Sequence, residues 1–122
     1  MKEKKDNHKR HLLENFEAQF KKSTLPLMVL KLLSEKEMYA YEITQEAVKR
    51  SNGKYKMPLL YTTLGKLQEQ GFVEESDKVI SADNRVRIYY RLTAEGHTYL
   101  EKLKNLYADL IATVQSIVYD EE

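Results

Sequence analysis

The chain has 122 residues and a mass of 14.4 kDa, enough for one domain with one hydrophobic core. Hydrophobic residues make up 42% and charged residues 32%, which is typical of a globular, helix-rich protein and excludes a disordered or fibrous one. Cysteine is absent, which excludes disulfide scaffolds, thiolate zinc sites and cysteine nucleophiles, and the net charge of +1 taken alone argues against a nucleic-acid partner.

The sequence contains no membrane or export signal. Its apolar runs fall far short of the ~20 residues that span a bilayer. The first residues, MKEKKDNHKRH, lack the apolar stretch of a secretory signal, so we expect a cytoplasmic protein with no membrane partner. Because this segment is polar and mixed in charge, we expect residues 1–11 to form a frayed arm.

Two helices are predicted before residue 36. An apolar stripe at three-to-four spacing predicts an amphipathic helix that ends near Ser23-Thr24. The stripe comprises Leu12, Leu13, Phe16 and Phe20. Ser23 or Thr24 is expected to cap a second helix over about 25–35, with Pro26 in its first turn. This second helix is apolar on most faces and is expected to be the central helix of the core.

Two further helices follow in the sequence. Residues 39–51 have apolar side chains on one side of a predicted helix, which ends at the turn signal Asn52-Gly53. Residues 57–70 form the next predicted helix, with Leu60, Leu64 and Leu67 on its inward face. Gly71 is well placed as the residue that stops this helix.

After Gly71 the pattern changes to that of a two-stranded hairpin. Phe72-Val73 opens a short extended run, residues 88–92 are rich in β-forming types, and the loop tip lies near 81–86. Tyr89 and Tyr90 point to opposite sides of the strand, so we expect at least one of them to pack in the core. Thr93 is expected to cap a last helix over about 94–119.

The last predicted helix carries an apolar seam of coiled-coil spacing. The seam comprises Leu103, Tyr107, Leu110, Val114 and Ile117. One chain has too little of its own protein to cover it, so we expect a homodimer whose interface also takes Leu13, Phe16 and Phe20. Phe16 and Tyr107 have two interpretations that stay open. They pack in this interface, or they form a platform for a small aromatic or hydrophobic effector.

The order of elements is that of a winged helix-turn-helix. The predicted fold is mainly α with a small β-hairpin. It has an N-terminal arm and dimerisation helix (1–24), a DNA-binding domain (25–92) and a C-terminal dimerisation helix (93–122). In this order the helix over 57–70 is the recognition helix, which fits the major groove of DNA. Its outer face offers Tyr61, Thr62 and Lys66, and the hairpin offers Arg85 and Arg87 to phosphates or to the minor groove.

The small net charge hides unlike segments. Residues 1–92 hold 18 Lys and Arg against 13 Asp and Glu, a net charge of +5, whereas residues 93–122 hold two Lys against six acids, a net charge of −4. Residues 47–68 contain five basic residues and no acid. A solvated face is the alternative explanation, but with this element order we expect phosphate contacts, Lys54 and Lys56 among them.

Several segments together carry a family resemblance. They are LPLMVLKLLS (25–34), YAYEI (39–43), SNG (51–53), LLYTTLGKLQEQGFVEE (59–75) and RIYYRLTAEGHTYL (87–100), with YYRLTAEG the most distinctive string. On these motifs the sequence resembles the PadR family of bacterial transcriptional regulators, and its length resembles the short subfamily, which includes multidrug-sensing repressors. The resemblance implies a homodimeric repressor that binds a palindromic operator. It also suggests that the Tyr41 hydroxyl reaches a phosphate, with a capping or plain surface role as the alternative.

The sequence also departs from the family pattern. Met57-Pro58-Leu59 occupies the start of the recognition helix, where family members commonly have Ser or Asn plus Thr, so contacts of these three residues with DNA stay undecided. No tryptophan is present, and Tyr107 falls where the best-known drug-binding relatives have a Trp that stacks on aromatic ligands.

The sequence offers no catalytic motif and no metal-ligand cluster. No Gly-rich phosphate loop or carboxylate pair appears, and His8 with His11 supplies too few ligands for a metal ion. We therefore expect neither an enzyme nor a cofactor. The alternative to a DNA-binding regulator is a winged helix that serves as a protein-protein interaction module, and the acid-free stretch over 47–68 argues for DNA.

Overall fold

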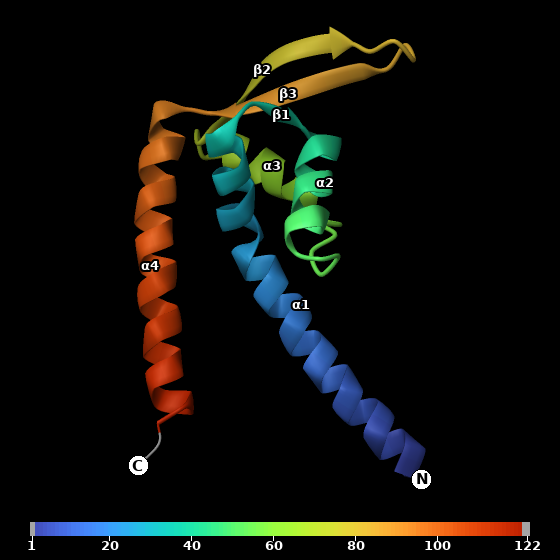
Figure 1. The fold of residues 1–122 in the computed structure, drawn as a ribbon, viewed down its shortest axis with the longest axis vertical. Coiled ribbons are helices and arrows are strands. Elements are labelled where there is room, and N and C mark those ends of the chain that lie inside the picture. Colours follow the sequence, from blue (N-terminus) through green and yellow to red (C-terminus); the bar gives the residue numbers. More distant parts are fainter. Residues whose placement is uncertain (1, 121–122) are drawn as a thin grey trace.

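The computed structural model describes residues 2–120, with side chains from residue 8 onward. Figure 1 shows the arrangement of helices and strands in this part of the chain. In chain order they are α1 (Lys2–Glu35), β1 (Met38–Tyr39), α2 (Ala40–Arg50), α3 (Leu60–Glu69), β2 (Val73–Ile80), β3 (Val86–Leu92) and α4 (Ala94–Val118). This is the predicted mainly helical, winged helix-turn-helix fold, with β2 and β3 as the wing.

α1 is one continuous helix, so the predicted frayed arm and the predicted break at Ser23-Thr24 are both wrong. The hydroxyls of Ser23 and Thr24 donate to the carbonyl oxygen of Phe20, at 3.0 and 2.9 Å, and so bond within the helix instead of capping a new one. Pro26 lies inside α1, and Figure 1 shows the helix changing direction along its length, as a missing backbone N–H allows. The preceding residues lack Gly and Pro, which favours helix back to Lys2.

The hydrophobic core lies between Leu25 and Leu100, a packed region that we call the head. Leu30 of α1, Ile43 of α2 and Leu64 of α3 are almost completely buried within it. The predicted central place of residues 25–35 in the core is therefore confirmed, although they are the last part of α1 and not a separate helix. The remaining described side chains, residues 8–24 of α1 and 101–120 at the end of α4, form two arms that extend from the head (Figure 1).

The sheet has three antiparallel strands in the order β1-β3-β2. The sequence predicted only the hairpin, because β1 has two residues and is too short to show a pattern. Met38 of β1 pairs with Tyr90 of β3, and Val73 of β2 pairs with Leu92. Tyr90 is buried and Tyr89 is half-buried, as the alternation along a strand predicts.

α3 begins at Leu60, three residues later than predicted. Met57 adopts a left-handed conformation (φ 53°) with its side chain buried, and the Leu60 N–H donates to the Met57 carbonyl oxygen at 3.2 Å. Residues 57–59 are thus a turn that sets the start of α3. The predicted turn at Asn52-Gly53 and the predicted stop at Gly71 are confirmed, since all three residues have positive φ.

α4 is fixed to the head through its first turn. The Thr93 hydroxyl accepts a hydrogen bond from the Gly96 N–H at 3.0 Å, which confirms the predicted cap, and donates to the Gly71 carbonyl oxygen at 2.6 Å. A Cβ atom on Gly96 would lie 2.1 Å from the Phe72 carbonyl oxygen, so this close approach requires glycine. The ring of Phe72 stacks on Tyr99 with centroids 4.2 Å apart. The direction in which α4 leaves the head is therefore set by direct contacts.

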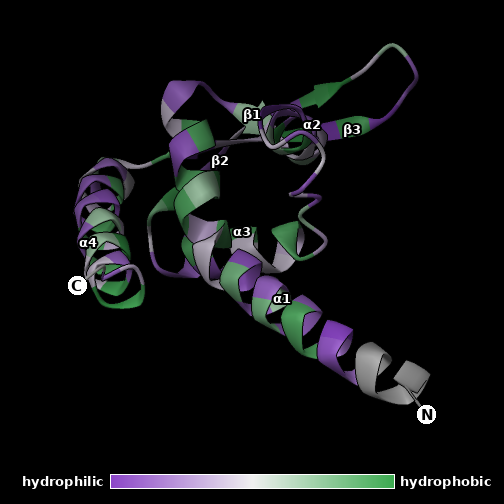
Figure 2. Cartoon of the chain, turned by 60° about the horizontal axis from the view of Figure 1, so that its bottom comes forward, coloured by the Kyte–Doolittle hydropathy of each residue, from purple (hydrophilic) through white to green (hydrophobic). Residues whose placement is uncertain are grey.

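Apolar character continues beyond the head. Figure 2 shows hydrophobic segments along α1 toward the N-terminus and along α4. They alternate with hydrophilic segments, and none of the helices in the described region is long and apolar enough to cross a membrane.

Candidate nucleic-acid interface

α3 divides its side chains between the core and the surface. Leu60, Leu64 and Leu67 are buried, as the sequence predicted. Tyr61 is 74% exposed, and Thr62 and Lys66 are exposed beside it. The helix therefore presents a hydroxyl-bearing, positively charged face without giving up its core contacts.

Four of the predicted DNA-binding residues meet in one cleft. The cleft has a volume of about 510 Å³ and lies between the start of α2, the start of α3 and the end of the wing. Tyr41, Tyr61, Arg85 and Arg87 all line it, and we call it the wing cleft. Its remaining lining residues are Tyr39, Ala40, Val86, Ile88 and Tyr90. Residues up to 51 positions apart in sequence thus share one surface.

Arg87 is held in this cleft by Tyr39. The guanidinium carbon lies 4.7 Å from the centre of the Tyr39 ring, a cation-π geometry. The Tyr39 ring in turn packs edge-on against Tyr89 at 5.4 Å and stacks near Tyr41 at 6.5 Å. The sequence pattern does not assign Tyr39 to the site, because it places this residue on the apolar side of the helix predicted over 39–51. The signal that could have found it is the Tyr39-x-Tyr41 spacing across the junction of β1 and α2.

The tip of the wing is ordered by its own polar contacts. The Ser81 N–H donates to the Arg85 carbonyl oxygen at 2.9 Å, and the Ser81 hydroxyl donates to the Asp83 carboxylate. This last hydrogen bond lowers the pKa of Asp83. Arg85 lies 3.5 Å from Asp83 yet stays 81% exposed, so its charge faces solvent.

The two loop lysines lie in a different groove. Lys54 and Lys56 line a groove of about 500 Å³ between α1 and the segment before α3. Leu59 lines this groove and Tyr61 lines the wing cleft, so both hollows border the amino end of α3. Pro58 and Leu59 are exposed there, whereas Met57 is buried. Among the described residues no three His, Asp or Glu side chains gather as a metal site requires.

Comparison with known proteins places this arrangement in a family. A model of the transcriptional regulator PadR-like family matches residues 29–102. The chain belongs to this family. The matched range contains α2, α3 and the wing, so this PadR-like protein is a transcriptional regulator and not an enzyme.

Individual relatives agree with this assignment. An uncharacterised protein of Lysinibacillus sphaericus is 34% identical over 88 residues, 70% of this chain and 80% of that protein. A PadR-like transcriptional regulator of Bacillus cereus is 25% identical with a TM-score of 0.70, over 84% of this chain and 99% of that one. PadR of Bacillus subtilis, solved in complex with operator DNA, is 28% identical with a TM-score of 0.57, over 66% of this chain and 47% of that one.

The arms of this PadR-like regulator carry the residues predicted for a dimer. Apart from the half-buried Leu103, all of them are exposed in the single chain: Leu13, Phe16, Phe20, Tyr107, Leu110, Val114 and Ile117. α1 and α4 diverge from the head like the sides of a V (Figure 1). The apolar residues of both arms are therefore without enough cover from their own chain.

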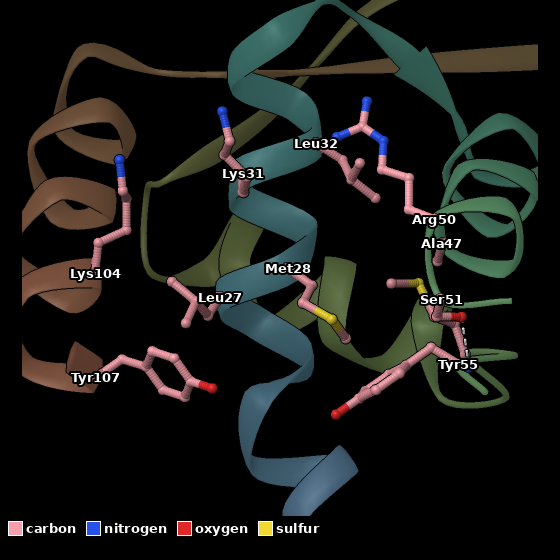
Figure 3. Close-up of a pocket in the computed structure, with 11 residues that line it drawn as sticks. Leu27, Met28, Lys31, Leu32, Ala47, Arg50, Ser51, Tyr55, Lys104 and Tyr107 are labelled. Carbon is pink, nitrogen blue, oxygen red and sulfur yellow. Dashed lines mark hydrogen bonds between the residues drawn. The ribbon is translucent and has the colours of Figure 1, made fainter. Parts of the chain in front are cut away.

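A mostly apolar cavity lies between α1 and α4, close to the point where the two arms leave the head. It has a volume of about 490 Å³ and is lined by α1, α2 and α4. Figure 3 shows Leu27 and Tyr107 facing each other across it and Met28 turned toward Tyr55. Tyr107, one of the two predicted effector residues, lines this cavity, whereas Phe16 lies outside it on the arm.

Proposed function

We propose that this chain is a sequence-specific DNA-binding regulator that acts in the cytoplasm as a homodimeric repressor. The observation that carries the proposal is the exposed face of α3 beside the wing cleft, where Arg85 and Arg87 lie near Tyr61. Such a combination of a helix, hydroxyl groups and fixed cations suits the grooves and phosphates of duplex DNA. The operator-bound relative from Bacillus subtilis supports the same assignment.

Each group has a proposed role on DNA. Thr62 and Lys66 on the outer face of α3 face base edges in the major groove, and the hydroxyls of Tyr41 and Tyr61 donate to phosphate oxygens. Arg85 and Arg87 reach the adjacent minor groove or its phosphates from the wing. The loop lysines Lys54 and Lys56 neutralise phosphates at the amino end of α3.

The proposal of a dimer rests on the exposed apolar residues of the two arms. The exposed seam of α4 and the exposed stripe of α1 are apolar, and α4 of a second copy has the same seam with which to cover them. In this proposal residues 25–92 bind DNA, while residues 1–24 and 93–122 join two copies. Two heads related by a two-fold axis match a palindromic operator whose half-sites lie about one helical turn apart.

An effector site is proposed at the cavity beside Tyr107. Its lining of Leu27, Met28 and Tyr55 suits a small aromatic or hydrophobic molecule, and the cavity lies next to the proposed interface. If Tyr107 stacks on such a molecule, Tyr107→Ala leaves the dimer intact and abolishes its release of DNA by that molecule. If Tyr107 only packs, Tyr107→Ala weakens the dimer itself.

The test is a selection from a random DNA library with the purified full chain. We expect a two-fold symmetric sequence to be enriched and bound as one dimer per duplex. Lys66→Gln should weaken binding to the selected duplex, whereas Lys102→Gln on α4 removes the same charge and should not. Enrichment of no sequence, together with binding of another protein through α3 and the wing, would favour the interaction-module alternative.

A further inference from the structure

The groove that holds Lys54 and Lys56 also contains two lysines from α1. Lys21 and Lys22 line its opposite wall, 32 or more positions earlier in the sequence. Four lysines and no acidic residue thus line one groove of about 500 Å³, which we call the lysine groove. Its remaining lining residues are Ala18, Leu25, Gly53, Tyr55, Met57, Pro58 and Leu59.

Tyr55 fixes the two walls of the lysine groove relative to each other. Its hydroxyl lies 3.3 Å from the Thr24 hydroxyl of α1, a hydrogen bond between the walls. Its backbone N–H donates to the Ser51 hydroxyl at 2.9 Å. The Lys21 ammonium lies 5.5 Å from the centre of the Tyr55 ring. The two walls that carry the lysines are therefore joined by specific contacts.

The charge in this groove is only slightly compensated. Lys21 has an ion pair with Glu17 of the same helix at 3.6 Å, and this carboxylate is outside the groove lining. Lys22, Lys54 and Lys56 are exposed. Placing four like charges around one groove is unfavourable unless an anion occupies it. Several phosphates of one backbone match a set of four cations better than one small anion does.

The position of the lysine groove beside α3 indicates which part of the DNA backbone it would contact. Leu59, which lines the groove, precedes the first residue of α3, and its side chain does not cap the helix. The amino end of α3, where the helix dipole is positive, therefore borders this groove. A duplex whose major groove receives α3 continues past this end.

We infer that the lysine groove binds the DNA backbone just outside the half-site that α3 contacts, so that α1 itself extends the contact with DNA. This inference rests on the proposed function and adds Lys21 and Lys22 of α1 to the DNA-binding residues. Because these lysines meet phosphates and not bases, they add affinity and salt dependence without adding sequence preference.

The experiment compares the full-length protein with the double variant Lys21→Gln, Lys22→Gln on a selected duplex and on the same duplex trimmed to its half-sites. The wild type should bind the trimmed duplex more weakly than the long one, and trimming should weaken the variant less, because only Lys54 and Lys56 remain in its groove. The salt slope of the variant on the long duplex should fall by up to about 3.6, because each neutralised phosphate contributes about 0.9 and the dimer loses two lysines from each copy. Discrimination between the selected and a scrambled sequence should stay unchanged.

The matched control is Lys9→Gln with Lys102→Gln, which removes the same charge from two exposed positions outside the groove. It should retain the salt slope and the flank dependence of the wild type. If the wild type binds no duplex selectively, the proposed function fails. If the wild type binds selectively but trimming the flanks affects it and the Lys21→Gln, Lys22→Gln variant equally, only the inference about α1 is overturned.

Discussion

The head and the two arms use the same kinds of apolar residue in opposite ways. In the head, Leu64 is only 1% exposed and Ile43 is completely buried. In the arms, Leu13 is 74% exposed, Phe16 73% and Ile117 75%. The head is thus a complete core within one chain, whereas the apolar residues of the arms are exposed in the single chain. Full burial of each such side chain is worth about 1.5–3 kcal/mol, so the proposed association of the arms would have a large driving force.

The largest effect should come from placing a charge on the seam of α4. Leu110→Glu is expected to give a monomer at micromolar concentration, because a carboxylate cannot be buried without a partner. Loss of the second head should then weaken DNA binding by about 100-fold or more, since linked sites gain that much from acting together. Sedimentation and DNA titration measure the two effects.

The control for this change is Ala112→Glu. It adds the same charge to α4 at an exposed position off the seam and should keep the dimer and its affinity. A Leu110→Glu protein that remains dimeric would contradict the assignment of the seam.

The second prediction compares the same substitution, Leu to Ala, in the head and in an arm. Leu64→Ala should lower the free energy of unfolding by about 2–5 kcal/mol at every protein concentration, because it leaves a cavity in the core. Leu13→Ala should have little effect on a dilute monomer and a growing effect as the concentration rises. Urea denaturation at low and high protein concentration separates the two, and an equal effect of Leu13→Ala at both concentrations would contradict a role in dimerisation.

A smaller effect concerns an ion pair at the edge of the head. Two nitrogens of the Arg50 guanidinium donate to the Glu35 carboxylate at 2.9 and 2.5 Å. Arg50 is the main cause that lowers the pKa of Glu35 from 4.5 to about 2, with a smaller contribution from Lys31. Because the folded pKa is depressed, the stabilisation is fully present above about pH 5 and is lost as the pH falls toward 2.

The variant Glu35→Gln tests this pH dependence. At pH 7 it should be less stable than the wild type by about 1 kcal/mol, the range of a partly exposed ion pair. The difference between the two proteins should shrink as the pH is lowered from about 5 to 2. Denaturation curves over this range give the measurement, and a difference that stays constant with pH would assign the effect to packing instead.

The smallest expected effect is on the wing. Arg87→Gln should reduce the salt slope of DNA binding by up to about 1.8 and weaken binding several-fold at low salt, because each copy of the dimer loses one phosphate contact worth about 0.9. Tyr39→Leu, which removes the ring under the guanidinium, should produce part of the same loss while Arg87 is still present. DNA titrations at several salt concentrations give both slopes. Unchanged salt slopes of DNA binding in both variants would show that the wing cleft does not contact DNA.

Much of the head follows from local sequence signals. The inward leucines of α3, the Thr93 cap and the Gly71 stop are short-range features, since each depends on residues within one or two helical turns. Their places in the structure agree with the prediction. The assignment of Tyr61, Arg85 and Arg87 to one DNA-facing side follows from the order of elements, and that of Tyr41 from the family resemblance, whereas the cleft in which they meet does not.

Other features depend on contacts between distant segments. The strand β1 exists because Met38 and Tyr39 pair with β3, and two residues carry no strand pattern of their own. Ser23 and Thr24 look like a helix start in sequence, yet their hydroxyls bond within α1. Ser and Thr occur both as helix caps and inside helices, where their hydroxyls bond to a backbone carbonyl one turn earlier. The local sequence pattern therefore predicted the wrong role for these two residues.

Sequence patterns alone specify the order of α2, α3, the wing and α4, the positive charge of the middle segment and the apolar seam of α4, because periodicity and composition are properties of neighbouring residues. Only the tertiary structure decided that Tyr39 supports Arg87 and that Lys21 and Lys22 join Lys54 and Lys56 around one groove. These pairs come from segments about 30 to 50 positions apart. Their meeting depends on how α1 passes the loop before α3 and on how β1 docks on the wing, which no local pattern specifies.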